Sequence, residues 1–468
     1  MPLLSLPPEI ILLITDQLDS NSDFSRLLLV NHFIHNLLIG QLYRRDISDT
    51  GGLALLFYSN WGYDSAAQHM LAAGVNADIR GPLWGTRTPL LLAISRHHTT
   101  LVKILLDHGA CPNFMDNVKH GPLETAILNK CGDDMIELLL DYGADVNLKG
   151  YQERTPLFTA VSSGNSRGVA LLLARGANVH VRESKDGRIP LHFAAETAGS
   201  SDVVKMLLDR GSDVHLRTPT GDDGGQTALH YACKSWGGAS EVIRLLIDHG
   251  ADVNSRDFRQ RTPLFLVGER SRESAEVLLE NGADICARDE RGCTVLHYSA
   301  KQMSVKMVTW LCEQGADVKW SNDNDETPLF TAIGSQVAWK ETPRIIQALL
   351  DLGADVNHEN RRGQTPLCLA ASSGCPVTTK MLLEHGANVH NTDKEEMTAI
   401  HWSTRTRIAG SSSHVICEII GLLIEHGADV NSRNLAGQTP LGMNLQLGTR
   451  DKGTLQVRKY LINAGGTE

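Results

Sequence analysis

An apolar run closed by glycine recurs along most of the chain and restricts its fold more than any other feature. The clearest copies read E-L-L-L-D-Y-G-A-D-V-N (137–147), K-M-L-L-D-R-G-S-D-V-H (205–215), R-L-L-I-D-H-G-A-D-V-N (244–254) and K-M-L-L-E-H-G-A-N-V-H (380–390). The closing glycines are Gly74, Gly109, Gly143, Gly176, Gly211, Gly250, Gly282, Gly315, Gly353, Gly386, Gly427 and Gly465. Their mean spacing is about 35.5 residues, which is typical of an array of structural repeats.

A second mark lies about 21 residues upstream of most of these glycines. It reads T-P-L at Thr88, Thr155, Thr262, Thr327, Thr365 and Thr439, with variants that begin at Ile189, Thr227, Thr294 and Thr398. A threonine hydroxyl can cap a helix, and a proline suits the first helical turn. Glycine closes a helix because it adopts the left-handed conformation without steric cost. Each unit is therefore predicted to hold two helices, joined to the next unit by a turn or short hairpin.

The two marks in fixed register resemble the ankyrin repeat over roughly residues 50–468. The resemblance implies an all-α dominated solenoid of helix pairs with short hairpin turns. Residues 48–468 would form about 12 units, of which the first is degenerate, and each unit would bury its apolar face against its neighbours. The spans that follow Thr327, Thr398 and Thr439 are longer than the others. We expect these extra residues between the inner and the outer helix of each unit.

The ankyrin resemblance also implies a scaffold that binds proteins through hairpin tips and inner helices. The exposed, variable positions lie four, three and one residues before the threonine mark, and seven and eight after it. The partner-binding residues predicted in this way are Trp84, Arg87, Arg96, Tyr151, Gln152, Arg154, Phe258, Arg259, Arg261, Arg270, Arg291, Lys301, Arg361 and Arg362. Aromatic and arginine side chains are typical of binding hot spots. So many arginines on a chain of net charge −10 favour an acidic protein segment as ligand, although each could instead be a solvated turn residue.

Nothing in the sequence predicts catalysis. The chain carries 19 histidines, but most of them follow the repeat. His192, His230, His297 and His401 take the fourth place of the inner-helix mark, and His108, His249, His385 and His426 precede the closing glycine. These positions indicate hydrogen bonding near helix ends. We therefore predict no enzyme, no cofactor and no metal site.

The distribution of charged, apolar and cysteine residues indicates which kinds of partner and which cellular compartment to expect. The 44 basic and 54 acidic residues are scattered, which argues against nucleic acid as a partner. No apolar segment is long enough to predict a transmembrane helix, so no membrane partner is expected. Nine scattered cysteines suggest buried thiols in a reducing compartment. We expect the cytoplasm, the nucleus or both.

Residues 1–47 do not follow the repeat period. A helix is predicted to begin at L-P-P-E, because prolines are tolerated in a first helical turn and an acidic residue is favourable there. Ile10, Leu13, Ile14 and Leu18 then recur at helical spacing, and a second amphipathic segment spans residues 24–38. Acidic residues within the apolar run argue against a signal peptide. So few helices cannot hold a core alone, so they need the repeats or a partner.

The order L-P-P-E-I, an apolar helix, D-F and then R-L-L-L-V-N resembles the F-box. F-box proteins dock onto a Skp-type adaptor in cullin-RING ubiquitin ligases, while a C-terminal repeat domain holds the substrate. Carried over to this chain, docking would use Leu6, Pro7, Pro8, Glu9, Ile10, Leu13, Leu18, Leu27, Leu28, Val30 and Phe33. The chain departs from the family pattern at Ile34, where an aromatic residue is common, and at His32, where a basic one is common. The alternative is a helical end-cap on the first repeat.

Overall fold

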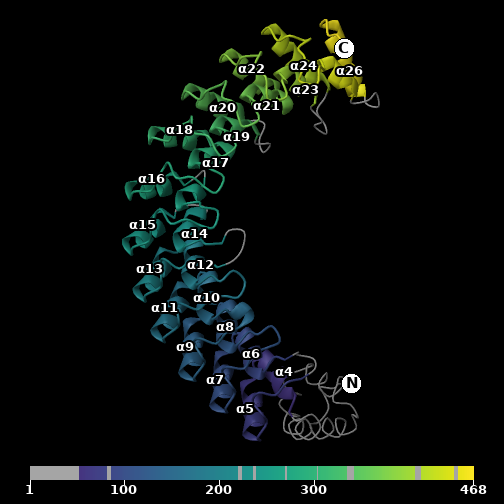
Figure 1. The fold of residues 1–468 in the computed structure, drawn as a ribbon. Coiled ribbons are helices and arrows are strands. Elements are labelled where there is room, and N and C mark those ends of the chain that lie inside the picture. Colours follow the sequence, from purple (N-terminus) through teal and green to yellow (C-terminus); the bar gives the residue numbers. More distant parts are fainter. Residues whose placement is uncertain are drawn as a thin grey trace, which may run out of the picture. The chain divides into compact units, whose positions relative to one another are not determined.

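A computed structural model describes residues 52–81, 86–219, 224–235, 239–268, 271–302, 304–334, 342–405, 413–446 and 452–468 (Figure 1). The chain divides into two compact units, unit 1 (Met1–Thr220) and unit 2 (Gly221–Glu468). Each is considered by itself below. The described residues are helical and contain no strand, which confirms the predicted helical class. Residues 1–47, and with them the predicted domain boundary at residue 47, lie outside the described part.

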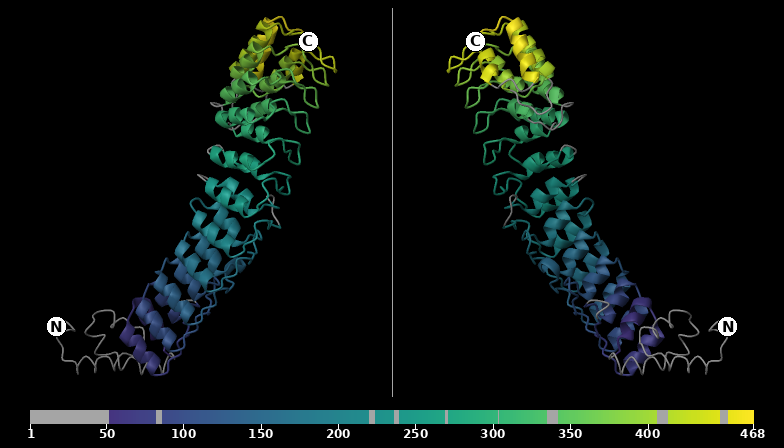
Figure 2. Two further views of the ribbon diagram at one scale, coloured as in Figure 1. Left: turned by 90° about the vertical axis from the view of Figure 1, so that its left-hand side faces the viewer. Right: turned by 90° about the vertical axis from the view of Figure 1, so that its right-hand side faces the viewer.

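Unit 1 is a stack of helix pairs, visible in two further views in Figure 2. Within its described residues the inner helices are α4 (Ala54–Trp61), α6 (Pro89–Ser95), α8 (Pro122–Leu128), α10 (Pro156–Ser162) and α12 (Pro190–Glu196). The outer helices are α5 (Asp64–Ala72), α7 (Thr99–Asp107), α9 (Asp133–Asp141), α11 (Ser166–Ala174) and α13 (Ser201–Asp209). A short 3₁₀ turn, η3, covers Tyr151–Glu153.

Unit 2 repeats the same plan. Its described inner elements are α14 (Ala228–Lys234), η4 (Pro263–Leu266), α17 (Val295–Lys301), α19 (Pro328–Gly334), α21 (Pro366–Ser372), α23 (Ala399–Thr404) and α25 (Pro440–Gln446). Its outer helices are α15 (Ser240–Asp248), α16 (Arg272–Glu280), α18 (Val305–Glu313), α20 (Thr342–Asp351), α22 (Pro376–Glu384), α24 (Ser413–Glu425) and α26 (Lys452–Asn463).

Helix ends follow the two sequence marks. The Thr88 hydroxyl caps α6 by accepting a hydrogen bond from the Leu91 N–H at 3.4 Å. At the other mark, Gly109 has a φ of 85°, in the left-handed region that favours glycine. Its N–H donates to the Leu106 carbonyl at 3.0 Å, which satisfies one of the carbonyls left open at the end of α7. The same cap forms at Thr365 and Thr439, whereas the buried hydroxyls of Thr155, Thr262 and Thr327 have no hydrogen-bond partner among the described residues. The predicted cap therefore forms at only part of the threonine marks.

One predicted inner helix is absent. The mark at Thr262 begins a four-residue 3₁₀ turn, η4, and Val267 then leaves the helix in an extended conformation (φ −66°, ψ 119°). Only 20 residues separate Thr262 from Gly282, one fewer than separate Thr88 from Gly109. The unit is therefore a residue short. The β-branched Val267 and the Gly268 after it are also weak helix formers.

The extra residues of the last units are found partly where the sequence predicts them. Residues 335–341, 406–412 and 447–451 all fall between an inner and an outer helix. The remaining residues lengthen outer helices: α24 has 13 residues and α26 has 12, whereas α22 has nine. Part of the insertions after Thr398 and Thr439 is therefore absorbed as helix.

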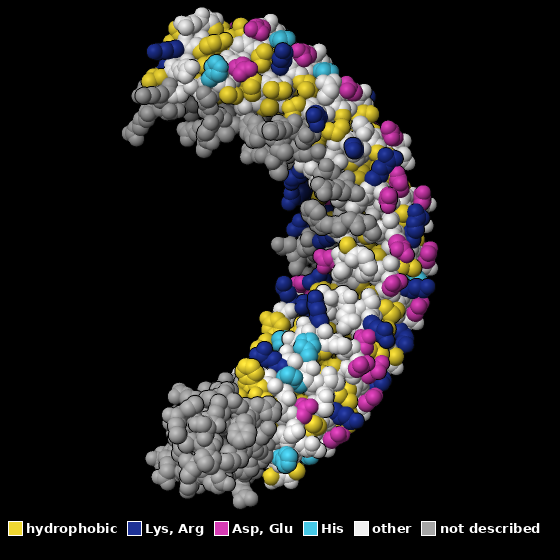
Figure 3. All heavy atoms as spheres, turned by 180° about the vertical axis from the view of Figure 1, so that it is seen from behind, with side chains coloured by type: hydrophobic (Ala, Val, Ile, Leu, Met, Phe, Trp, Pro, Cys, Tyr) yellow, Lys and Arg dark blue, Asp and Glu magenta, His cyan; other side chains and the backbone are white. Residues whose placement is uncertain are grey.

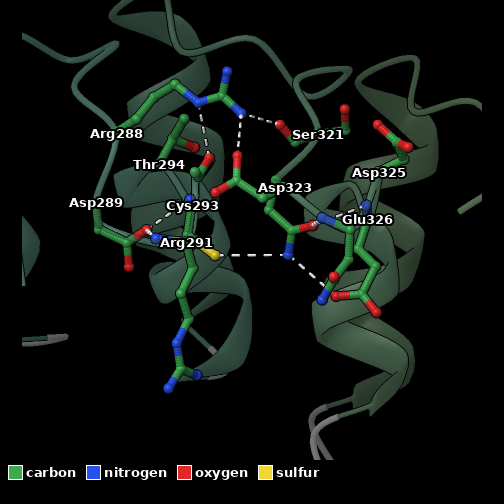
Figure 4. A network of polar contacts seen from close by, with 12 residues as sticks. Arg288, Asp289, Arg291, Cys293, Thr294, Ser321, Asp323, Asp325 and Glu326 are labelled. Atoms are coloured by element: carbon green, nitrogen blue, oxygen red, sulfur yellow. Dashed lines mark hydrogen bonds and ion pairs between the residues drawn. The ribbon is translucent and has the colours of Figure 1, made fainter. Parts of the chain in front are cut away.

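Polar contacts order the hairpin tips, the turns that precede each inner element. In one tip the Asp289 carboxylate accepts hydrogen bonds from the N–H groups of Arg291 (2.9 Å) and Cys293 (2.8 Å). Arg288 donates to the Gly292 carbonyl of its own tip and to the Ser321 carbonyl of the next, at 3.0 and 2.8 Å (Figure 4). Neighbouring tips thus lie side by side at fixed spacing.

Candidate functional site

The repeat histidines have structural roles. The His297 Nδ1 accepts a hydrogen bond from the Thr294 N–H at 3.1 Å, and its Nε2 donates to the Glu326 carbonyl of the next repeat at 3.0 Å. His230 and His401 make the same two contacts. The Nε2 of His192 bonds to the Leu216 carbonyl, whereas the other three rings bond to the carbonyl of the residue just before the next threonine mark. Each ring therefore fastens one repeat to the backbone that follows it.

Burial affects the charge state of these rings. It lowers the pKa of His297 to about 4, against which the hydrogen bond to the Glu326 carbonyl acts only partly. Burial also lowers the pKa of His401. The second histidine set is different, since His249 and its equivalents bond through Nδ1 to a carbonyl of their own helix. Among the described residues, no three His, Cys, Asp or Glu side chains gather as a metal site.

Most predicted partner-binding residues lie at the surface. Tyr151 and Phe258 are 54% and 56% exposed. Arg87, Arg96, Arg291, Lys301, Arg361 and Arg362 are exposed, and Gln152 and Arg259 are half-buried. Figure 4 shows the Arg291 side chain pointing away from the tip contacts around it. Trp84 and Arg270 lie outside the described residues.

Two of the predicted arginines form ion pairs with buried acids. Arg261, expected at the surface, is only 7% exposed, and its guanidinium pairs with the buried Asp257 at 2.7 Å. Arg154 pairs at 2.5 Å with Glu183, whose side chain is fully buried. Both acids hold a hairpin tip, so their arginine partners stabilise the repeats. The expected exposure of Arg261 is therefore wrong, because its position in the repeat carries no information about the acid beneath it.

Figure 3 shows that acidic and basic side chains are interspersed over the outer helices. The tips of unit 2 are also mixed. Arg361 lies 3.7 Å from Asp325, and Arg405 lies 3.8 Å from Glu395. At these two places of unit 2 an acid therefore lies beside the arginine. An arginine that lies beside an acid has its charge compensated within the chain. An arginine that no described acid pairs with is therefore a better indication of an acidic ligand.

Such an arginine lines a cleft of about 480 Å³ in unit 1, which we name the α6–α8 cleft. Its lining residues come from three inner helices and two hairpin tips: Asn60, Arg87, Leu91, Leu92, Ser95, Arg96, Asp116, His120, Thr125, Leu128 and Asn129. The sequence predicted Arg87 and Arg96 as partner-binding residues, and Ser95 lies seven residues after Thr88, at one of the variable positions. The structure brings them together with residues that the sequence did not single out, among them Asn60, His120 and the 47% exposed Leu128.

The charged groups of the α6–α8 cleft are two arginines, Arg87 and Arg96, and one acid, Asp116. Arg96 Nε donates to the Asn60 amide oxygen at 3.1 Å, which holds this guanidinium at the cleft wall. Asp116 is the acid of the lining, and its Oδ1 already accepts the N–H groups of Val118 and His120, both at 2.9 Å. No described acid forms an ion pair with Arg87. The cleft therefore offers a surplus of positive charge.

A second cleft, of about 690 Å³, lies in unit 2. We name it the α23–α25 cleft; its lining is Glu395, Met397, Thr404, Arg405, Asn434, Leu435, Ala436, Gln438, Met443 and Gln446. Leu435 is 69% exposed at its rim. Here the one arginine is paired with the one glutamate, so the cleft, whose lining mixes polar and apolar residues, has no surplus charge. None of its residues was predicted as a partner-binding residue.

Helix pairs, capping threonines, left-handed glycines and aligned hairpin tips together fit one repeat family. A model of ankyrin repeats (3 copies) matches residues 55–150, 148–218, 217–289, 267–339 and 335–434. The chain is an ankyrin repeat protein. Ankyrin repeats act in protein–protein interaction, and proteins built from them are generally non-enzymatic scaffolds. A search of curated proteins finds no significant match to the chain.

The family comparison gives no F-box match, and the predicted docking residues lie outside the described part of the chain. Among the helices that the structure describes, none is long and apolar enough to cross a membrane. The unit of α8 carries only the glycine mark, because α8 begins after Gly121, where no threonine stands. The buried Glu124 takes the place that histidine has in four other units, and its carboxylate accepts a hydrogen bond from the Thr159 hydroxyl at 3.0 Å. Burial raises the pKa of Glu124.

Proposed function

We propose that this ankyrin repeat protein is the substrate receptor of an SCF-type cullin-RING ubiquitin ligase. In this proposal residues 1–47 dock the Skp-type adaptor, and the ankyrin units bind the target protein. The pattern L-P-P-E-I followed by an apolar helical stripe carries the proposal, because the repeat period does not explain it. No catalytic residue is needed. The receptor raises the effective concentration of a bound target near the ligase.

The described residues support the target-binding half of the proposal. Exposed aromatic residues and arginines lie at hairpin tips and beside inner helices, which is where hot-spot residues need to be accessible. The tips are held by backbone hydrogen bonds and by arginine contacts such as those of Arg288. A pre-ordered surface loses little conformational entropy on binding.

The alternative is an ankyrin scaffold in which the N-terminal helices cap the first repeat. Its support is the small size of the segment, because the two helices predicted within residues 1–47 are too few to hold a core alone and need either the repeats or a partner. In that case residues 1–47 would be needed for stability and not for adaptor binding.

Co-expression with a Skp-type adaptor separates the two functions. We expect the full chain to capture the adaptor, and the double variant Leu6→Ala/Pro7→Ala to lose capture with an unchanged circular dichroism melt. Leu12→Ala is the matched control, because Leu12 lies outside the stripe of Ile10, Leu13 and Leu18. Absence of capture by the intact chain would refute the receptor function. A melt that collapses when residues 1–47 are deleted would favour the cap.

A further inference from the structure

We propose that the α6–α8 cleft binds an extended segment of the target protein that carries an Asp or Glu next to an apolar residue. This inference rests on the target-binding half of the proposed function and is independent of adaptor docking. It assigns the ligand to one cleft and gives it a chemistry.

Charge complementarity is the first argument. Arg87 is exposed, and no described acid pairs with it. Arg96 is held by a neutral amide, Asn60, so its charge is not neutralised by that contact. The one acid of the lining is Asp116, and one of its carboxylate oxygens already accepts hydrogen bonds from two backbone N–H groups of its own tip. Two guanidinium groups beside one partly occupied carboxylate favour an anionic ligand, and planar guanidinium groups match carboxylates.

The apolar part of the cleft is the second argument. Leu91 and Leu92 on α6 are buried beneath it, and Leu128 at the end of α8 is about half exposed. A charged ligand alone would leave Leu128 in water. A protein segment that places an apolar side chain against Leu128, and a carboxylate near Arg87 and Arg96, would use both features. The cleft volume of about 480 Å³ falls within the usual range for ligand sites, roughly 300–1,000 Å³.

The α23–α25 cleft shows by contrast why the assignment goes to unit 1. It is larger, but its arginine, Arg405, faces Glu395 at 3.8 Å. A carboxylate ligand would have to displace this glutamate. At the tips of unit 2, Arg361 is similarly placed 3.7 Å from Asp325. Of the two clefts, the α6–α8 cleft is therefore the one with positive charge that no described acid pairs with.

The test is a selection of short random peptides displayed on phage against the full chain, followed by binding measurements on the selected peptides. We expect the peptides to be enriched in Asp or Glu beside Leu, Ile, Val or Phe. Their affinity should fall at least tenfold in Arg87→Ala/Arg96→Ala, because each lost charge-assisted hydrogen bond weakens binding several-fold or more. Arg244→Ala/Arg272→Ala, on the exposed faces of the outer helices α15 and α16 of unit 2, is the matched control and should leave the affinity unchanged.

Two further variants separate binding from folding. Leu128→Asp changes an exposed residue, so we expect it to fold and to repel the acidic peptides. Arg87→Glu should restore binding of a peptide in which the acidic residue is replaced by Lys, and a purely structural role for Arg87 would not produce this rescue. All variants should keep the melting temperature of the parent chain.

Three outcomes would overturn the inference: selected peptides without acidic residues, a selection that returns no binding peptide, or affinities that fall equally in the unit 2 control. Peptides that bind only when phosphorylated would assign the cleft to a different ligand and would also overturn it. Capture of the Skp-type adaptor is expected to be unchanged in every cleft variant. Failure of this inference is therefore distinguishable from failure of the receptor function.

Discussion

The buried ring of His297 makes the stability of its repeat depend on pH. In the folded chain its pKa is about 4, and burial is the main cause. In the unfolded chain the ring regains its ordinary value of 6.5. As the pH falls, the unfolded state therefore binds a proton first. The stabilisation is complete above pH 6.5 and is lost progressively as the pH falls towards 4.

The size of this effect follows from the two pKa values. One pH unit between them corresponds to about 1.4 kcal/mol. Between pH 7.5 and pH 5 the folded state therefore loses about 2 kcal/mol relative to an unfolded chain that takes up the proton. Protonation of Nδ1 would also remove the acceptor for the Thr294 N–H, whose hydrogen bond begins α17. The lowered pKa of His401 acts in the same direction.

Urea unfolding of the parent chain and of His297→Gln at both pH values measures this effect. We expect the variant to be less stable at pH 7.5, and the difference between the two proteins to shrink by about 2 kcal/mol at pH 5. His249→Gln removes an exposed imidazole and controls for the loss of a histidine as such. A difference between parent and His297→Gln that is the same at both pH values would refute the reasoning.

Two further variants test the polar contacts of the repeats by urea unfolding at neutral pH. Glu183→Gln should cost about 3–5 kcal/mol, because it leaves Arg154 and Arg188 beside a neutral group at a fully buried position. Glu153→Gln breaks only an exposed pair and should change stability by under about 1 kcal/mol. Thr365→Ala removes the cap of α21 and should cost about 1 kcal/mol, so an unchanged midpoint would contradict the capping interpretation.

Much of the fold could be predicted from the sequence because its helix signals are local. A capping threonine before proline and a left-handed glycine act within one turn of chain, so Thr88 and Gly109 mark helix ends wherever the repeat occurs. The structural role of His297 and its equivalents was predicted for the same reason. The marks failed at Thr262, where a one-residue deletion leaves a 3₁₀ turn, and at Gly121, where the capping residue is missing.

The candidate site could be predicted only in part because it depends on contacts between repeats. Sequence position gives Arg87, Arg154 and Arg261 the same place in the repeat, yet only Arg87 is open to a ligand. The other two meet buried acids, Glu183 and Asp257, and only the fold places those acids beneath them. The α6–α8 cleft likewise combines residues of three inner helices and two tips, a set that no single repeat contains.

In the proposed receptor, adaptor docking and target binding are carried by separate parts of this chain. Isothermal titration calorimetry of a purified Skp-type adaptor into the full chain tests it most directly. We expect one-to-one binding by the parent chain and by Arg87→Ala/Arg96→Ala, and no binding by Leu6→Ala/Pro7→Ala. Absence of binding by the parent chain, or equal binding by all three proteins, would contradict the account.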